Sequence, residues 1–90
     1  MKINVALFGL GRIGAMHAQN IKKNNKFNLK YVYDVNKKLS LNVSKKLKTI
    51  NIKNPYIAFK DKSIKVIFIF HLYKVCKIIF IHGMVVIVAR

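Results

Sequence analysis

Residues 8–14 read FGLGRIG, and this glycine-rich run directly follows an apolar stretch, residues 3–8, that is typical of a buried β-strand. Three glycines spaced as G-x-G-x-x-G after a strand and before a helix are typical of a turn that binds a dinucleotide. Gly9 would permit the tight turn, Gly11 would leave room for a pyrophosphate, and Gly14 would let the helix lie close to the strand.

Asp34 supports the same interpretation, because it lies 20 residues after Gly14 and ends a second strand candidate, residues 29–35. A carboxylate there can accept the hydroxyls of the adenine ribose and repels a 2′-phosphate, so the sequence predicts NAD in preference to NADP. The pyrophosphate would lie at the amino end of the helix that begins at Arg12, where free N–H groups favour an anion. The alternative is that the glycines serve close packing alone and that Asp34 merely ends a strand.

Two helices are expected in the first half of the chain. The first covers residues 12–24 and would turn one face to the core, and the second runs from residue 37 to about 48 with Asn36 as its N-cap. The expected core face of the first helix consists of Ile13, Met16 and Ile21, with Ala15 and Ala18 alongside. That of the second consists of Leu39, Val43 and Leu47.

The second half is more apolar. Residues 65–70 and 84–88 are continuous apolar runs of the kind found in parallel strands that are buried on both faces. Residues 56–59 are expected to form a short strand at most, and residues 72–82 a helix. Alternating strands and helices predict an α/β fold, namely a partial Rossmann-like parallel sheet with flanking helices, in one domain over residues 1–90.

The chain is strongly basic, with 18 Lys and Arg against 2 Asp and Glu and a net charge of +16. Its lysines are scattered from Lys2 to Lys77 in runs of no more than two, and arginine, the better residue for bidentate phosphate contacts, occurs only at positions 12 and 90. We therefore expect solvated surface lysines, and neither a nucleic acid nor a membrane as partner. The rival hypothesis is a small basic protein that binds a polyanion or a membrane surface.

Cys76 is the only cysteine, so no internal disulfide can form, and its apolar neighbours favour a buried structural thiol in a reducing cytoplasm. The uncharged runs 66–73 and 78–89 are shorter than the ~20 apolar residues of a membrane-spanning helix. No signal-peptide cleavage site follows the first apolar run. These features predict a cytoplasmic protein.

Three stretches carry a resemblance to a known family: VALFGLGRIGAMHAQNI (residues 5–21), LKYVYDVN (29–36) and SIKVIFI (63–69). They resemble the amino-terminal domain of the Gfo/Idh/MocA oxidoreductases, above all the inositol dehydrogenase branch, strongly over residues 2–48 and fairly over 61–69. Members use NAD(P) to oxidise a sugar or cyclitol hydroxyl to a ketone. The resemblance implies that Asp34 contacts the ribose and that the pyrophosphate contacts are Gly9, Gly11, Arg12, Ile13 and Gly14.

Beyond residue 69 the resemblance is poor. The Glu-Lys pair of the family's closing motif falls on Ala89 and Arg90, so the resemblance supplies no catalytic residue. His71 and His82 have no partners at metal-ligand spacing and are interpreted as non-functional, and His17 is interpreted as a packing residue.

These departures lead to the expectation of a truncated or frameshifted domain that binds NAD and is inactive alone. A sugar or cyclitol substrate would need a second domain. Unpaired edges at residues 65–70 and 84–88 would favour self-association. A gene fragment without function is the third alternative.

Overall fold

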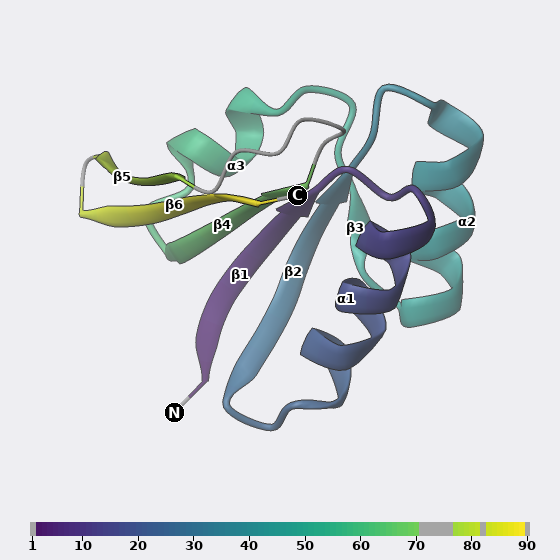
Figure 1. The fold of residues 1–90 in the computed structure, drawn as a ribbon, viewed down its shortest axis with the longest axis horizontal. Coiled ribbons are helices and arrows are strands. Elements are labelled where there is room, and N and C mark those ends of the chain that lie inside the picture. The colour runs from purple at the N-terminus through teal and green to yellow at the C-terminus, as the bar shows by residue number, and fades with distance from the viewer. Residues whose placement is uncertain (1, 71–76, 82, 90) are drawn as a thin grey trace.

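The computed structural model describes residues 2–70, 77–81 and 83–89, which form one twisted sheet with helices on both faces (Figure 1). The strand order is β3-β2-β1-β4-β6-β5; every neighbouring pair is parallel except β6 and β5. The elements are β1 (Ile3–Phe8), α1 (Arg12–Lys23), β2 (Phe27–Tyr33), α2 (Lys37–Leu47), β3 (Ile50–Asn51), α3 (Tyr56–Lys60), β4 (Ile64–Phe70), β5 (Lys77–Ile81) and β6 (Met84–Ala89). The α/β fold with a parallel sheet is confirmed.

Strand β1 lies inside the sheet, between β2 and β4, and positions the glycine turn. Its last residue, Phe8, is in register with Tyr33 of β2 and Ile69 of β4. The chain order of the strands reverses at β1, with β2 on one side and β4 on the other, and a ligand site in an open α/β sheet forms at the carboxyl ends of the strands at such a point.

Both faces of β1 are buried, which explains its continuous apolar sequence. Successive side chains of a strand point to opposite faces. Val5 and Leu7 belong to the core under α1 and α2, whereas Ala6 and Phe8 belong to the core under α3. All four are at most 7% exposed.

Helix α1 begins at Arg12 as predicted, but only part of its expected core face is buried. Gly14 and Ala18 are buried and Ile21 is half-buried, whereas Ile13 and Met16 are 51% and 53% exposed. The small residues face the sheet because the helix follows the turn so closely that a larger side chain has no room there.

Helix α2 has the predicted N-cap: Asn36 Oδ1 accepts the N–H groups of Lys38 and Leu39 at 3.1 and 3.3 Å. The expected apolar stripe is wrong at Leu39, which is 36% exposed. The buried residues of the helix are Ser40 and Ser44. Their hydroxyls donate to Asn51 Oδ1 and to the Leu41 carbonyl, so the helix can pack at the β3 edge of the sheet through satisfied polar groups.

Two predictions in the second half are wrong. Residues 56–60 form helix α3 instead of a strand: Pro55 has a helical φ of −62°, and the Asn54 side chain accepts the Tyr56 N–H at 2.9 Å, so the chain turns directly into a helix. Residues 77–81, expected in a helix, form strand β5. Their sequence, KIIFI, is rich in β-formers and pairs antiparallel with β6.

The strands formed by the two apolar runs are not at the edge of the sheet, contrary to expectation. Strand β4 pairs with β1 and β6, and β6 pairs with β4 and β5, so both are interior. His71, Cys76, His82 and Arg90, discussed above from the sequence, lie outside the described residues. In the described part of the chain, no helix has the length and apolarity needed to cross a membrane.

Candidate functional site

The turn after β1 is built so closely that two of its glycines are required by the fold. Gly9 has a φ of +91°, donates its N–H to the Tyr33 carbonyl at 2.8 Å, and lies so near β4 that a Cβ would stand 2.0 Å from the Phe70 carbonyl oxygen. A Cβ on Gly14 would stand 1.9 Å from the Gly9 carbonyl oxygen. Both contacts involve backbone atoms, which cannot move aside as a flexible side chain can.

Gly11 has a different environment. Its φ is −64°, which any residue can adopt, and no heavy atom lies within 4 Å of the place where its Cβ would be. Packing and backbone conformation therefore leave the glycine at this position unexplained. It borders an open cavity.

Gly11 is also the N-cap of α1, and no side chain caps this helix. The first N–H groups of a helix lack intrahelical partners, and the positive end of the helix dipole lies beside them. Together with the Arg12 side chain, which borders the same cavity, they form a place suited to an anion.

The cavity at the carboxyl ends of β1, β2 and β4 has a volume of about 870 Å³. Its lining includes all six predicted site residues: Gly9, Gly11, Arg12, Ile13, Gly14 and Asp34. The fold therefore brings Asp34 to the glycine turn, from which it is separated by 20 residues of sequence.

The Asp34 carboxylate is held at the edge of the cavity by two backbone groups. Its Oδ2 accepts the Leu10 N–H at 2.6 Å, and its Oδ1 accepts the Asn36 N–H at 2.8 Å. These bonds orient the carboxylate between the glycine turn and the start of α2. Each oxygen keeps a further acceptor position, because a carboxylate offers about four lone pairs in all.

No sequence pattern above predicted the apolar part of the lining, which consists of Phe8, Tyr33, Val35, Pro55, Phe59, Ile69 and Phe70. The Phe8 ring meets the rings of Tyr33 and Phe59 edge-on, with centroids 5.7 and 5.8 Å apart. Tyr33 and Ile69 could have been predicted from the sequence, because they lie at the carboxyl ends of β2 and β4, where the site forms. Nothing local signalled Pro55 or Phe59, which reach the site through α3.

His17 does not line this cavity. Its ring stacks on the Phe70 ring with centroids 4.6 Å apart and an angle of 5° between the planes. The interpretation of His17 as a packing residue is confirmed, since the stack joins α1 to the end of β4.

The site combines an anion-binding turn, a carboxylate that can accept hydroxyl groups and an apolar wall. A dinucleotide carries the matching groups: a charged pyrophosphate, ribose hydroxyls and flat aromatic rings. The free space at Gly11 and the uncapped start of α1 both agree with such a ligand.

Comparison with known proteins agrees with this geometry. Residues 3–73 match the model of the Gfo/Idh/MocA family, described as an oxidoreductase family with an NAD-binding Rossmann fold. No curated protein sequence matches the chain significantly.

The similar solved structures include several dehydrogenases. A myo-inositol dehydrogenase from Corynebacterium glutamicum is 29% identical, with a TM-score of 0.69 over 77% of this chain and 21% of its own. A probable dehydrogenase from Thermotoga maritima is 27% identical, with a TM-score of 0.67 over 73% of this chain and 20% of its own. The myo-inositol dehydrogenase from Lactobacillus casei in complex with NAD(H) and myo-inositol shares the fold at 15% identity, with a TM-score of 0.70 over 77% of this chain and 21% of its own.

This chain thus spans about a fifth of the length of these solved proteins. The family model, by contrast, covers most of the 90 residues. The chain belongs to the Gfo/Idh/MocA oxidoreductase family and has its NAD-binding Rossmann fold.

Proposed function

We propose that this chain is the cofactor-holding part of a dehydrogenase that uses NAD to oxidise a hydroxyl group of a cyclitol or sugar. The observation that carries the proposal is that the glycine turn and Asp34 line the same cavity. The substrate class is supported by the similar myo-inositol dehydrogenases. A cytoplasmic location is part of the same proposal.

In this proposal the pyrophosphate of NAD lies on the glycine turn. Its contacts are Gly9, Gly11, Arg12, Ile13 and Gly14, all of which line the cavity. The N–H groups at the start of α1 donate to the phosphate oxygens, and Arg12 adds a positive charge beside them. The absence of a side chain at Gly11 lets the phosphates approach the backbone.

Asp34 accepts the hydroxyl groups of the adenine ribose. Its two hydrogen bonds from backbone N–H groups hold the carboxylate in place at the edge of the cavity before the cofactor arrives. The same negative charge repels the 2′-phosphate of NADP, so NAD is the preferred cofactor. When bound, NAD supplies the hydride acceptor, and the residues of this chain bind and orient it.

Cofactor preference tests the proposal. NAD and NADP are titrated into the purified chain by calorimetry, and NAD is expected to bind more tightly. Asp34→Ser removes the negative charge and introduces a hydroxyl that can still accept a hydrogen bond, so it should narrow the difference in affinity between the two cofactors. Asp61→Ser removes the only other carboxylate, which lies outside this cavity, and should leave the ratio of affinities unchanged.

Equal binding of NAD and NADP by the unmodified chain would contradict the assigned role of Asp34. If the difference between NAD and NADP affinity narrowed equally in Asp34→Ser and Asp61→Ser, the net charge of the chain, and not the position of the carboxylate, would set the cofactor preference.

A further inference from the structure

The lysines that are scattered in the sequence gather at one edge of the folded molecule. In a parallel sheet the strands all start at one edge, and each helix that returns to the next strand ends there. Ten lysines lie in the last turn of a helix, in the loop that follows it or at the start of one of the parallel strands, which excludes Lys77 at the start of the antiparallel β5. We call these ten the basic edge: Lys2, Lys22, Lys23, Lys26, Lys45, Lys46, Lys48, Lys60, Lys62 and Lys65.

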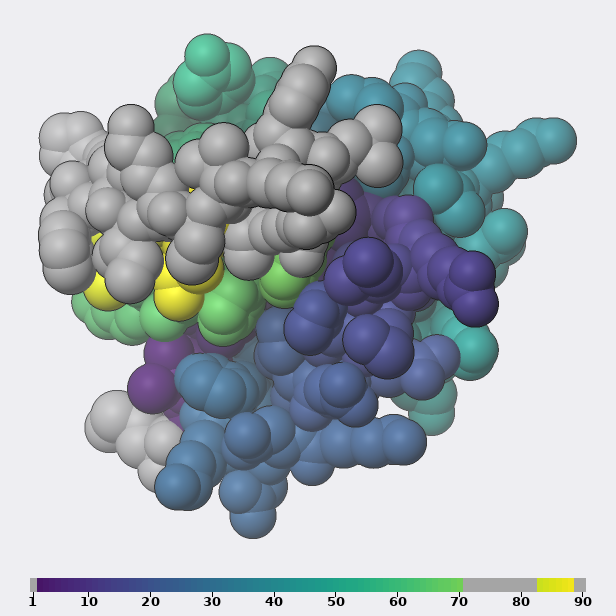
Figure 2. Space-filling view, in the orientation of Figure 1, coloured from purple at the N-terminus to yellow at the C-terminus, as the bar shows by residue number. Residues whose placement is uncertain are grey.

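All ten side chains of the basic edge are exposed. The bottom of the molecule in Figures 1 and 2, where α1 ends and β2 begins, belongs to this edge. The proposed NAD cavity lies at the opposite ends of the strands. The helix dipoles favour this placement of the lysines at the edge away from the cavity. All three helices carry lysine in the last turn, where the negative end of the helix dipole favours a cation.

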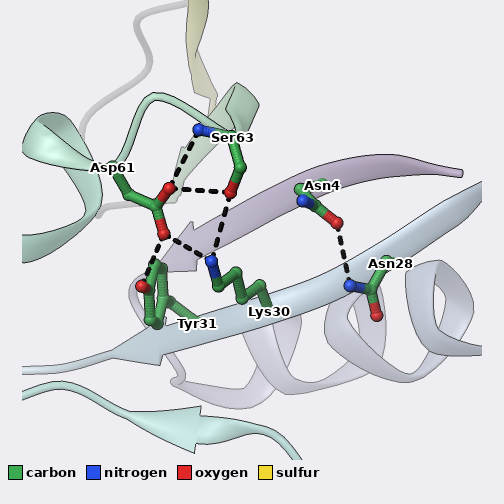
Figure 3. Close-up of polar contacts among 6 residues, drawn as sticks. All are labelled: Asn4, Asn28, Lys30, Tyr31, Asp61 and Ser63. Carbon is green, nitrogen blue, oxygen red and sulfur yellow. Dashed lines mark hydrogen bonds and ion pairs between the residues drawn. The ribbon is translucent and has the colours of Figure 1, made fainter.

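The one carboxylate beside the basic edge is already engaged inside the protein. Asp61 Oδ2 accepts Lys30 Nζ and the Tyr31 hydroxyl, both at 2.6 Å (Figure 3). Its Oδ1 accepts the Ser63 N–H at 2.9 Å and the Ser63 hydroxyl at 2.7 Å. Asp61 therefore cancels the charge of Lys30 and has no free oxygen with which to pair the exposed lysines.

A hollow of about 370 Å³ opens at the starts of β4 and β6. Lys60, Lys62 and Lys65 line it together with Asp61, and the network around Asp61 ties this loop to β2. Lysines around a concave surface concentrate positive potential there, because the protein wall has a low dielectric constant.

We propose that the basic edge binds the phosphate backbone of double-stranded nucleic acid without reading its sequence. Lysine ammonium groups contact phosphates as point charges, and such contacts supply sequence-independent affinity. The molecule measures 31 Å along its longest axis, enough to follow about nine base pairs at ~3.4 Å each. The proposal is separate from NAD binding and does not depend on it.

The described side chains favour a duplex over two other polyanions. Single strands bind by stacking successive bases on aromatic rings, whereas the described chain exposes one aromatic residue, Tyr56, which lies one turn before Lys60 in α3. Membrane surfaces select helices with an apolar face. The exposed apolar residues here are Ile3 and Ile50, which start β1 and β3, two strands separated by β2.

The test measures binding of a labelled DNA duplex of about 12 base pairs by fluorescence anisotropy between about 50 and 200 mM salt. The edge variant replaces Lys22, Lys23 and Lys26 with Gln. We expect at least about tenfold weaker binding at low salt and a salt slope smaller by about 2.7, which is ~0.9 for each lost phosphate contact. A second edge variant, with Lys60, Lys62 and Lys65 replaced by Gln, should show the same loss.

The matched control replaces Lys37, Lys38 and Lys53, three exposed lysines outside the basic edge, with Gln. It removes the same three charges from the net +16 and should weaken binding less than about threefold, because salt screens distant charges. Circular dichroism verifies the fold of each variant.

Five outcomes would overturn the proposal, the first four of which concern duplex binding, the variants and the competing ligands. These four are absence of duplex binding at low salt, equal weakening by the edge and control variants, tighter binding of a single strand than of a duplex, and tighter binding of vesicles containing phosphatidylserine. A second duplex of unrelated sequence should bind as tightly as the first, and a clear preference between the two would also contradict the proposal.

Discussion

At the residue scale, the three glycines of the turn have separate physical roles. Gly9 and Gly14 have no room for a side chain, because backbone oxygens lie about 2 Å from the Cβ that each lacks. Gly11 has room, and what a side chain would occupy there is the cavity. Ligand binding and folding can therefore be tested separately at neighbouring positions of one turn.

Gly11→Val should abolish NAD binding while the fold remains. The valine side chain would fill the proposed pyrophosphate position, and the φ of −64° is acceptable to valine. The expected change in the free energy of unfolding is below about 1 kcal/mol, the range of N-cap substitutions. Calorimetry measures NAD affinity, and urea unfolding measures stability.

Gly14→Ala is the contrasting variant. Its methyl group would overlap the Gly9 carbonyl, so it should lower stability markedly and disturb binding only as a consequence. If Gly11→Val bound NAD as strongly as the unmodified chain, the pyrophosphate would have to lie elsewhere.

The Asp61 carboxyl makes the stability of the fold depend on pH. The hydrogen bond from Lys30, followed by those from Tyr31 and Ser63, holds the pKa of the Asp61 carboxyl well below its ordinary value of 3.8. A carboxyl whose pKa is lower in the folded than in the unfolded chain stabilises the fold above its unfolded pKa. That contribution is lost as the pH falls through the folded pKa.

Between about pH 5 and pH 2, the free energy of unfolding should fall more steeply for the unmodified chain than for Asp61→Asn, which has no carboxyl to protonate. Urea unfolding at a series of pH values measures both curves. Ser63→Ala, which keeps the Asp61 carboxyl and three of its four hydrogen bonds, should retain most of the slope. Parallel curves for the unmodified chain and Asp61→Asn would show that the network does not lower the Asp61 pKa.

At the element scale, the starts of α1 and α2 have different uses. Helix α2 is capped by the Asn36 side chain, whereas no side chain caps α1, which opens on the cavity. A cap on α1 would compete with an anionic ligand for the same N–H groups. Helix α2 has no such ligand in our proposal, and the Asn36 side chain accepts N–H groups of its first turn.

Asn36→Ala should therefore destabilise the chain by about 1 kcal/mol, since it leaves N–H groups at the start of α2 without an acceptor. Asn42→Ala makes the same chemical change at an exposed position inside α2 and should leave stability equal or slightly higher, because alanine favours helix. Thermal unfolding of the two variants provides the comparison. Equal destabilisation would mean that the cap contributes nothing.

At the scale of the whole molecule, stability should increase from the edges of the sheet toward its centre. Strands β1 and β4 lie in the middle of the order β3-β2-β1-β4-β6-β5, whereas β3 and β5 form its edges. Central strands have partners on both sides and are buried by helices or neighbouring strands, so their amides open last.

Hydrogen exchange followed by NMR or mass spectrometry should find the slowest amides in β1 and β4 and faster exchange in β3 and β5. The loop between α1 and β2 provides an exposed reference in the same sample. Protection in β3 or β5 equal to that in β1 would indicate that another chain covers that edge, or that the strand order differs.

Much of the fold and of the site followed from local sequence patterns. The apolar run of β1 and the glycine spacing predicted the strand, the turn and the start of α1, and Asn36 predicted the start of α2. Asp34 was placed at the site because its distance along the chain from Gly14 suits one helix and one strand. These features depend on residues close in sequence, so the local backbone geometry alone is enough to predict them.

The tertiary structure alone decided the rest. Gly9 must be glycine because of the Phe70 carbonyl, and the apolar wall needs α3, whose residues had been expected in a strand. In the packing of α1 on the sheet, Gly14 is buried beside the expected Ala18, whereas Ile13 and Met16 are exposed. Ten lysines spread through the sequence form one basic edge, because the parallel strands of the sheet start on the same side and the helices end there. These features depend on contacts between distant segments, and spacing along the chain does not encode which segments meet.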